Sequence, residues 1–133
     1  AENGLDTMEI LHNNCLFYGD IALCGTRGWF YELDNQGTHD EKVLLREVGR
    51  LETSLKAAGE REKLCFLHYP PIYQGYECPE ILRLLKEYGA KACYYGHLHG
   101  ASHRRAIEGT RNGTLFSLVA GDFLGFVPKK ICE

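Results

Sequence analysis

The sequence of 133 residues contains no apolar run that approaches the roughly 20 residues of a membrane-spanning helix. Residues 1–6 lack the basic and apolar segments of a secretory signal peptide. The lysines and arginines are scattered and the net charge is −3, which argues against the basic surface of a nucleic-acid-binding protein. These absences argue against membrane and nucleic-acid partners.

Cysteine is not scarce, but the six cysteines form no Cys-x-x-Cys pair, which excludes zinc-ribbon and thioredoxin-like motifs. Cys65 and Cys93 lie inside short apolar runs, where a free thiol packs as a small hydrophobic group. Because no secretory signal is present, we expect reduced thiols and a cytoplasmic location. The alternative is a secreted module held by disulfides, which requires these thiols to be paired.

The composition, with 44% hydrophobic and 25% charged residues, is ordinary for a single globular domain, which we place at residues 1–133. Gly19-Asp20 separates two short apolar segments, residues 15–18 and 21–24. This pattern predicts a β-hairpin near the start of the chain.

An amphipathic helix is predicted after this hairpin. Thr38 is a suitable N-cap, Glu41 completes a capping box, and Gly59 marks the end of the helix. Its buried stripe consists of apolar residues spaced three or four apart: Leu44, Val48, Leu51, Leu55 and Ala58.

The middle of the chain predicts a β-α-β unit. Residues 64–67 form a continuous apolar run, typical of a strand covered on both faces, and Pro70-Pro71 prevent any strand or helix directly after it. A helix follows from Pro79 to Gly89, and residues 92–95 form the next strand. Strands joined through a helix in this way are parallel and adjacent, so the fold class is predicted to be α/β. The helix is expected to bury Ile81, Leu82, Leu85 and Tyr88.

The C-terminal part is predicted to be antiparallel. We expect strands at residues 104–108 and 114–120, joined through a turn at Arg111-Asn112-Gly113-Thr114. A final extended piece is expected at residues 126–131.

Three histidines follow the two parallel strands. His68 comes directly after the first strand, and His97 and His99 lie just beyond the second. Because ligand sites in open α/β sheets lie at the carboxyl ends of strands, we expect these imidazoles to reach one pocket. Neutral imidazole is the commonest transition-metal ligand, and Gly96 and Gly100 let the backbone turn tightly around the motif. The sequence therefore predicts a metal site at His68, His97 and His99.

Two segments of the sequence resemble the last two metal motifs of the calcineurin-like metallophosphoesterases. They are Phe66-Leu67-His68-Tyr69-Pro70-Pro71 and Tyr95-Gly96-His97-Leu98-His99-Gly100. Gly25-Thr26-Arg27-Gly28-Trp29 and the helix after it resemble a bacterial subgroup of predicted phosphohydrolases. The resemblance covers nearly the whole chain and implies a metallophosphoesterase-like α/β sandwich.

The resemblance also implies roles for the histidines. His68 and His97 would share one metal, and His99 would hold its neighbour. The complete enzyme would contain two divalent ions chosen from Mn, Fe, Zn, Ni and Co. Such ions, about 3.5–4 Å apart, activate a water molecule and clamp the phosphoryl oxygens.

The chain departs from the family in its metal-binding carboxylates. The family's Asp-x-His, Gly-Asp and Gly-Asn-His-Asp/Glu motifs precede this region, and we find no counterpart of them here. Gly19-Asp20 copies the letters of the second motif but lies in a hairpin turn. We therefore expect the chain to be the C-terminal portion of a metallophosphoesterase domain. Either only this segment was expressed, or the gene itself is truncated.

Without a bridging carboxylate, neutral ligands hold two dications together poorly. We expect one weakly held metal or none, and little or no turnover from this chain alone. No catalytic residue is identified, but two candidates have weaker support. Arg27 follows a strand in a glycine-rich loop and could meet a phosphate oxygen, although a plain surface role is the alternative. Asp122 also follows a strand and could hydrogen-bond to a metal-binding histidine, whereas His103 is expected to be solvated.

The predicted function of the complete protein is that of a metal-dependent phosphoester hydrolase, either a phosphatase or a phosphodiesterase. The alternative is a non-catalytic metal-binding or interaction domain that has lost the aspartate motifs. The expected substrate is a phosphoester, with protein, nucleotide and small phosphates all open. Because half of a sandwich exposes a sheet edge and apolar surface, we also expect a homodimer.

Overall fold

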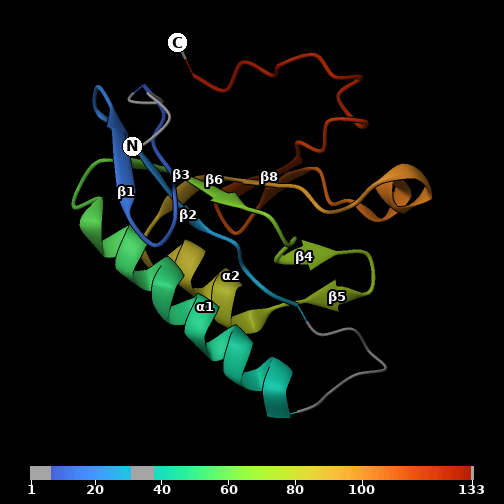
Figure 1. The fold of residues 1–133 in the computed structure, drawn as a ribbon, viewed down its shortest axis with the longest axis horizontal. Coiled ribbons are helices and arrows are strands. Elements are labelled where there is room, and N and C mark those ends of the chain that lie inside the picture. Colours follow the sequence, from blue (N-terminus) through green and yellow to red (C-terminus); the bar gives the residue numbers. More distant parts are fainter. Residues whose placement is uncertain (1–6, 31–37, 133) are drawn as a thin grey trace.

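The computed structural model describes residues 7–30 and 38–132. These residues form a six-stranded sheet with the strand order β1-β2-β3-β6-β8-β7 (Figure 1). The strands are β1 (Cys15–Tyr18), β2 (Ile21–Thr26), β3 (Glu62–Leu67), β6 (Ala90–Tyr95), β7 (Gly109–Arg111) and β8 (Thr114–Leu118). Strands β2, β3, β6 and β8 run parallel, and the edge strands β1 and β7 are antiparallel to their neighbours. The fold is therefore α/β, as the sequence predicts.

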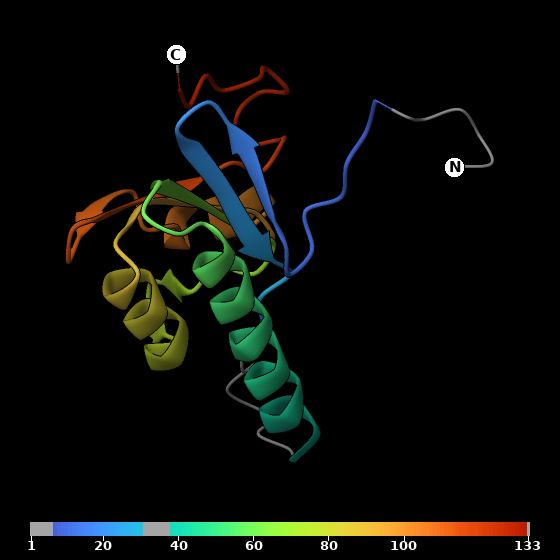
Figure 2. The same cartoon turned by 90° about the vertical axis from the view of Figure 1, so that its left-hand side faces the viewer.

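Two helices, α1 (Thr38–Ala57) and α2 (Pro79–Glu87), cover one face of this sheet (Figure 1 and Figure 2). In α1 the predicted apolar stripe is confirmed, since Leu44, Leu51 and Leu55 are buried and Val48 is partly buried. The expected cap at Thr38 lies outside the described side chains. Gly59 follows the helix with φ +57°, the left-handed conformation that commonly ends a helix.

Helix α2 begins at Pro79, as predicted, because proline suits the first helical position. Its buried side chains are Ile81, Leu84 and Leu85. Leu84 was not among the expected core residues, whereas Leu82 and Tyr88 were expected and are only partly buried.

The β-α-β prediction is confirmed by the parallel pairing of β3 with β6, in which Leu67 lies opposite Tyr95. The segment between β3 and α2 contains two short strands that the sequence did not predict. Ile72–Tyr73 forms strand β4 and Tyr76–Glu77 forms strand β5, a small antiparallel hairpin. Gly75, with φ +85°, supplies the tight turn between them. Pro70 and Pro71 themselves lie outside the strands, and β4 begins at the residue directly after them.

The prediction of a strand at residues 104–108 is wrong. Gly100–Arg105 forms a 3₁₀ helix, η1, and the antiparallel partner of β8 is β7, which is three residues long. The predicted turn is present and fixes the register, with Arg111 opposite Thr114. Upstream of β7 the carboxylate of Glu108 accepts the backbone N–H of Leu118. A side chain therefore takes the hydrogen bond that a longer strand would have made.

The end of the chain also differs from expectation. Strand β8 ends at Leu118, not at Ala120, and residues 121–126 form turns. The extended piece predicted at residues 126–131 joins no strand. Figure 1 shows this C-terminal segment on the side of the sheet away from the helices.

On that side of the sheet the apolar surface is less completely covered. Leu64, Ala92 and Tyr94 form a second apolar cluster, against which Ile131 of the C-terminal segment packs. Phe66 borders the cluster and is only partly buried. The sheet therefore has one face sealed by helices and one face covered by a single extended segment.

All six cysteines are free, which contradicts the disulfide-stapled alternative. Burial raises the pKa of Cys24 to about 12 and that of Cys78 to about 11, so both thiols stay protonated at neutral pH. Within the described ranges, no helix is both long and apolar enough to cross a membrane.

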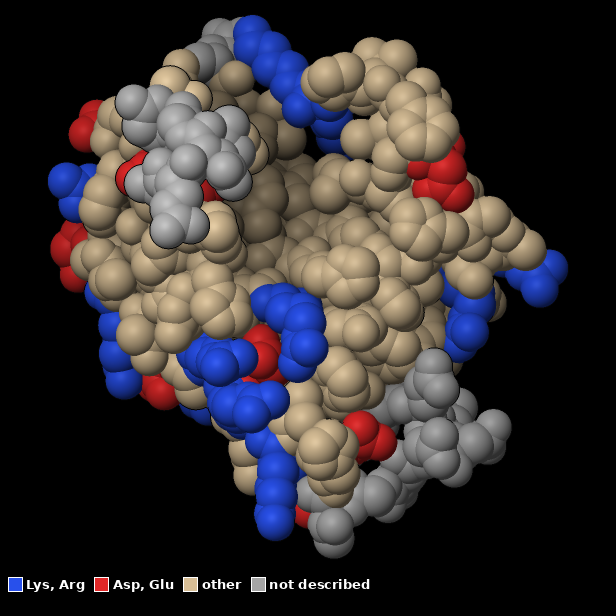
Figure 3. All heavy atoms as spheres, viewed as in Figure 1, with Lys and Arg blue, Asp and Glu red and all other residues tan. Residues whose placement is uncertain are grey.

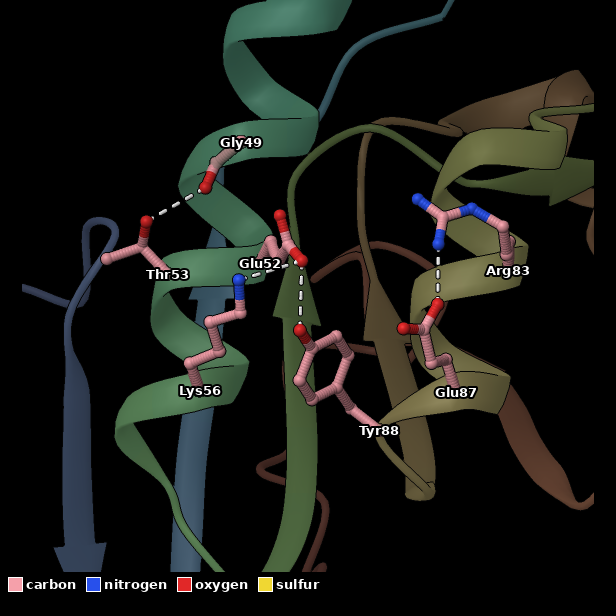
Figure 4. A network of polar contacts seen from close by, with 7 residues as sticks. All are labelled: Gly49, Glu52, Thr53, Lys56, Arg83, Glu87 and Tyr88. Atoms are coloured by element: carbon pink, nitrogen blue, oxygen red, sulfur yellow. Dashed lines mark hydrogen bonds and ion pairs between the residues drawn. The ribbon is translucent and has the colours of Figure 1, made fainter.

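Polar contacts join α1 to the residue that follows α2 (Figure 4). The Glu52 carboxylate accepts a hydrogen bond from the Tyr88 hydroxyl at 2.9 Å and pairs with Lys56 at 3.0 Å. Arg83 and Glu87 form a separate ion pair along α2. Hydrogen bonds from Lys56 and Tyr88 lower the pKa of Glu52.

We predict that Glu52→Gln destabilises the fold at neutral pH and that the difference from the wild type vanishes in acid. The pKa of Glu52 in the folded state lies below its ordinary value of 4.5. The stability contributed by the ionised carboxylate is therefore complete above that value and is lost as the pH falls through the lowered pKa. Urea unfolding across this pH range measures the effect. Glu87→Gln, which affects a pair within one helix, is the control, and an equal loss in both variants would contradict the prediction.

We also predict that the protein self-associates as a two-fold dimer, because partly covered apolar surface and the open edge strand β1 both favour pairing. Sedimentation at micromolar concentration measures this directly. Phe66→Ser, on the face away from the helices, should shift the protein toward monomer. A wild-type protein that remains monomeric throughout would show that the C-terminal segment covers the sheet sufficiently.

Candidate metal centre

His68 is the first residue after β3, and its backbone is tied to the end of β2. The N–H groups of His68 and Tyr69 both donate to the carbonyl oxygen of Arg27 at 3.0 Å. This double contact fixes where β3 ends and keeps the loop that carries Arg27 beside His68.

His97 lies two residues after β6 in a strained turn. Its φ is +69°, and the N–H of Leu98 donates to the carbonyl of Gly96 at 2.8 Å. Such a three-residue γ-turn with positive φ at its centre is rare. A non-glycine residue at its centre is strained, which lowers the stability of the fold. The N–H of Gly96 donates toward the carbonyls of Leu67 and His68 at 3.3 and 3.2 Å, which ties the turn to the end of β3.

The two imidazoles meet across the strand ends. Nδ1 of His97 lies 3.3 Å from Nε2 of His68. Two nitrogens bound at about 2.05 Å to a tetrahedral metal lie roughly 3.3 Å apart. The spacing of this pair therefore fits two ligands of one metal ion.

Aromatic rings surround the pair on one side. The ring of Tyr69 lies 4.6 Å from that of His97 and 4.7 Å from that of His68, and the ring of Phe30 lies 5.1 Å from that of His97. These contacts restrict the orientations of the two imidazoles, while His68 itself stays exposed.

The environment of His68 favours its neutral form. Burial, the neighbouring His99 and the charge of Arg27 lower the pKa of His68. A neutral imidazole keeps the lone pair that a metal requires.

Arg27 is half exposed and belongs to a charged cluster that the sequence did not reveal. Its guanidinium lies 3.7 Å from the carboxylate of Glu47, which is fully buried in α1 and also binds Arg50 and Thr26, each at 2.7 Å. The guanidinium stacks on the ring of Trp29 at 4.8 Å. Lys and Arg side chains gather around acidic atoms over α1 (Figure 3). Arg27 is thus held by its neighbours and keeps an exposed cationic surface.

The imidazole of His99 contacts the carboxylate of Asp122. Nδ1 of His99 lies 2.9 Å from Oδ1 of Asp122, and Nε2 of His103 lies 3.1 Å from Oδ2. The His103 contact is within ion-pair distance, but Nε2 of His103 makes no hydrogen bond to any described residue. The N–H of Gly100, with His99 and His103, holds the pKa of Asp122 well below its usual range.

The structure therefore brings the predicted residues together in two groups. His68 and His97 form one pair, and His99 belongs to a second group with Asp122 and His103. The predicted contact between Asp122 and a histidine is present, while its part in metal binding stays a prediction. The expectation that His103 is solvated is wrong, because its side chain is 25% exposed and packs on the ring of Phe123 at 5.3 Å. The signal that the sequence offered was the spacing His99-x-x-x-His103, which occurs in zinc sites.

The positive φ of His97 can be tested by its effect on stability. We predict that His97→Gly is more stable than His97→Ala by roughly 1 kcal/mol, because glycine adopts positive φ without the Cβ clash. At His99, where φ is −121°, the order should reverse. Denaturant unfolding of the four variants measures both differences, and the same order at both positions would show that His97 is not strained.

Comparisons of the chain with protein-family models, with curated proteins and with solved structures found no match.

Proposed function

We propose that the chain forms the histidine side of a metal-dependent phosphoester hydrolase centre, as the C-terminal portion of a metallophosphoesterase domain. The observation that carries the proposal is the His68–His97 pair, 3.3 Å apart at the ends of two adjacent parallel strands. This placement is the one expected for ligand sites in α/β sheets. The resemblance of both histidine motifs to the calcineurin-like family supports the same conclusion.

Each residue near the centre has a role under this proposal. His68 and His97 bind one divalent ion of the Mn, Fe, Zn, Ni or Co group, and His99 binds its neighbour. When bound, such ions lower the pKa of a water molecule and polarise the phosphoryl group. Arg27, whose backbone carbonyl binds the N–H of His68 and whose guanidinium is partly exposed, meets a non-bridging phosphate oxygen. The free thiols suit the reducing cytoplasm, where we place the protein.

The alternative is a non-catalytic metal-binding domain. Its support is the lack of the family's aspartate motifs from the sequence, since neutral imidazoles alone do not supply the bridging charge of a two-metal centre. Both functions require the histidine pair, and they differ in whether a phosphoester is hydrolysed.

Metal binding by the pair tests what the two functions share. We predict that titration with Co²⁺ gives a visible absorption band from nitrogen coordination, and that His68→Ala and His97→Ala each remove one bound equivalent. His39→Ala, at an exposed histidine in the first turn of α1, is the matched control. An unchanged number of bound ions in both pair variants would exclude the pair as a metal site.

Hydrolysis of an aryl phosphate with Mn²⁺ separates the two functions. This chain alone should show little or no turnover, because the carboxylates that complete the centre are missing. If the gene encodes the earlier motifs upstream of Ala1, the protein that includes them should be active and His97→Ala should abolish that activity. Inactivity of the longer protein would favour the non-catalytic alternative.

A further inference from the structure

Three metal-ligating side chains from separate segments converge beside the histidine pair. His99 ends the loop after β6, His103 lies in η1, and Asp122 follows β8. Their nitrogen and oxygen ligand atoms all lie within 4.8 Å of one another. We propose that His99, His103 and Asp122 form a second cation site, specific for a transition-metal dication. The inference deepens the proposed function and rests on it for the role of His99 as a ligand.

The distances within this cluster suit a common metal ion. Oxygens of Asp122 lie 2.9 Å from Nδ1 of His99 and 3.1 Å from Nε2 of His103. These contacts go to Oδ1 and Oδ2 respectively. Ligand atoms about 2.1 Å from one ion lie roughly 3.0 Å apart at right angles and roughly 3.4 Å apart in a tetrahedral site, and the observed distances are nearer the first value. Protons and metal ions compete for the same lone pairs, so the hydrogen bond between His99 and Asp122 marks a position that an ion could take in place of the proton.

The ligands are oriented by groups other than each other. The Asp122 carboxylate accepts the backbone N–H of Gly100 at 2.9 Å and that of Phe123 at 3.0 Å. The imidazole of His103 rests on the Phe123 ring. These contacts remain when the proton between His99 and Asp122 is replaced by an ion, so the site needs little rearrangement to bind.

The set of ligands selects the class of ion. Two imidazoles and one carboxylate suit Zn²⁺, Co²⁺, Ni²⁺ or Fe²⁺, whereas Ca²⁺ and Mg²⁺ prefer sites made entirely of oxygen. Asp122 also supplies the negative charge that the histidine pair lacks. For this reason the chain should bind two ions, whereas from the sequence alone we expect one weakly held ion or none.

The geometry without metal is also compatible with a different role for Asp122. It could orient His99 by accepting the proton of Nδ1, which leaves Nε2 of His99 as the metal ligand. In our proposal Nδ1 binds the ion and the proton moves to Nε2. The tautomer of His99 in the loaded protein therefore distinguishes the two.

The test measures stoichiometry and tautomer together. Equilibrium dialysis against Zn²⁺ should give two ions for the wild type and one each for His103→Gln, Asp122→Asn and the double variant His68→Ala/His97→Ala. Nitrogen-15 spectra of the Zn²⁺-loaded wild type should show His99 bound through Nδ1. Circular dichroism confirms that each variant is folded, and His39→Ala serves as the control.

The outcomes separate this inference from the proposed function. Two bound ions in both His103→Gln and Asp122→Asn, or a proton that stays on Nδ1 of His99, would overturn the second site. Two bound ions in the His68→Ala/His97→Ala variant would instead exclude the pair and leave the second site standing.

Discussion

The parallel register of β3 and β6 is the constraint on which the candidate centre depends. Leu67 lies opposite Tyr95, so both strands end at one level and the residues after them meet. The nitrogens of His68 and His97 are 3.3 Å apart as a result. A slip of one residue would displace the strand end by about 3.3 Å, as far as the nitrogens are separated. It would also turn every core side chain of that strand to the opposite face, which is why the register is strongly specified.

His97 shows how the fold maintains an unfavourable backbone conformation at this point. A positive φ at a histidine persists only where surrounding contacts determine it. Here the N–H of Gly96 binds the end of β3, and the rings of Tyr69 and Phe30 confine the imidazole. The strain therefore lies in a residue whose neighbours are rigid. That arrangement is typical of functional sites, where stability and ligand geometry make different demands.

Features with a local pattern were predictable from the sequence: the stripe of α1, the proline at the start of α2 and the β-α-β unit. The 3₁₀ helix η1 was not, because its first N–H, at Gly100, is bound by Asp122, 22 residues away. Glu108 likewise reaches Leu118 across the hairpin. Buried Glu47 was also missed, since a carboxylate on an amphipathic helix is normally solvated and its partner Arg27 lies on another element. These contacts depend on tertiary placement, which no local periodicity encodes.

The two histidine groups differ most in the charges beside them. The charge of Arg27 lowers the pKa of His68, whereas His99 lies 2.9 Å from the carboxylate of Asp122. A cation at one end of a site opposes the binding of a second dication there and favours an anionic ligand, while a carboxylate does the reverse. Asp122 therefore favours a cation at His99, whereas the exposed surface of Arg27, whose guanidinium also lies 3.7 Å from the carboxylate of Glu47, favours an anionic ligand. Under the proposed function both groups would stabilise a phosphoester, with metal ions and a fixed positive charge each meeting some of its oxygens.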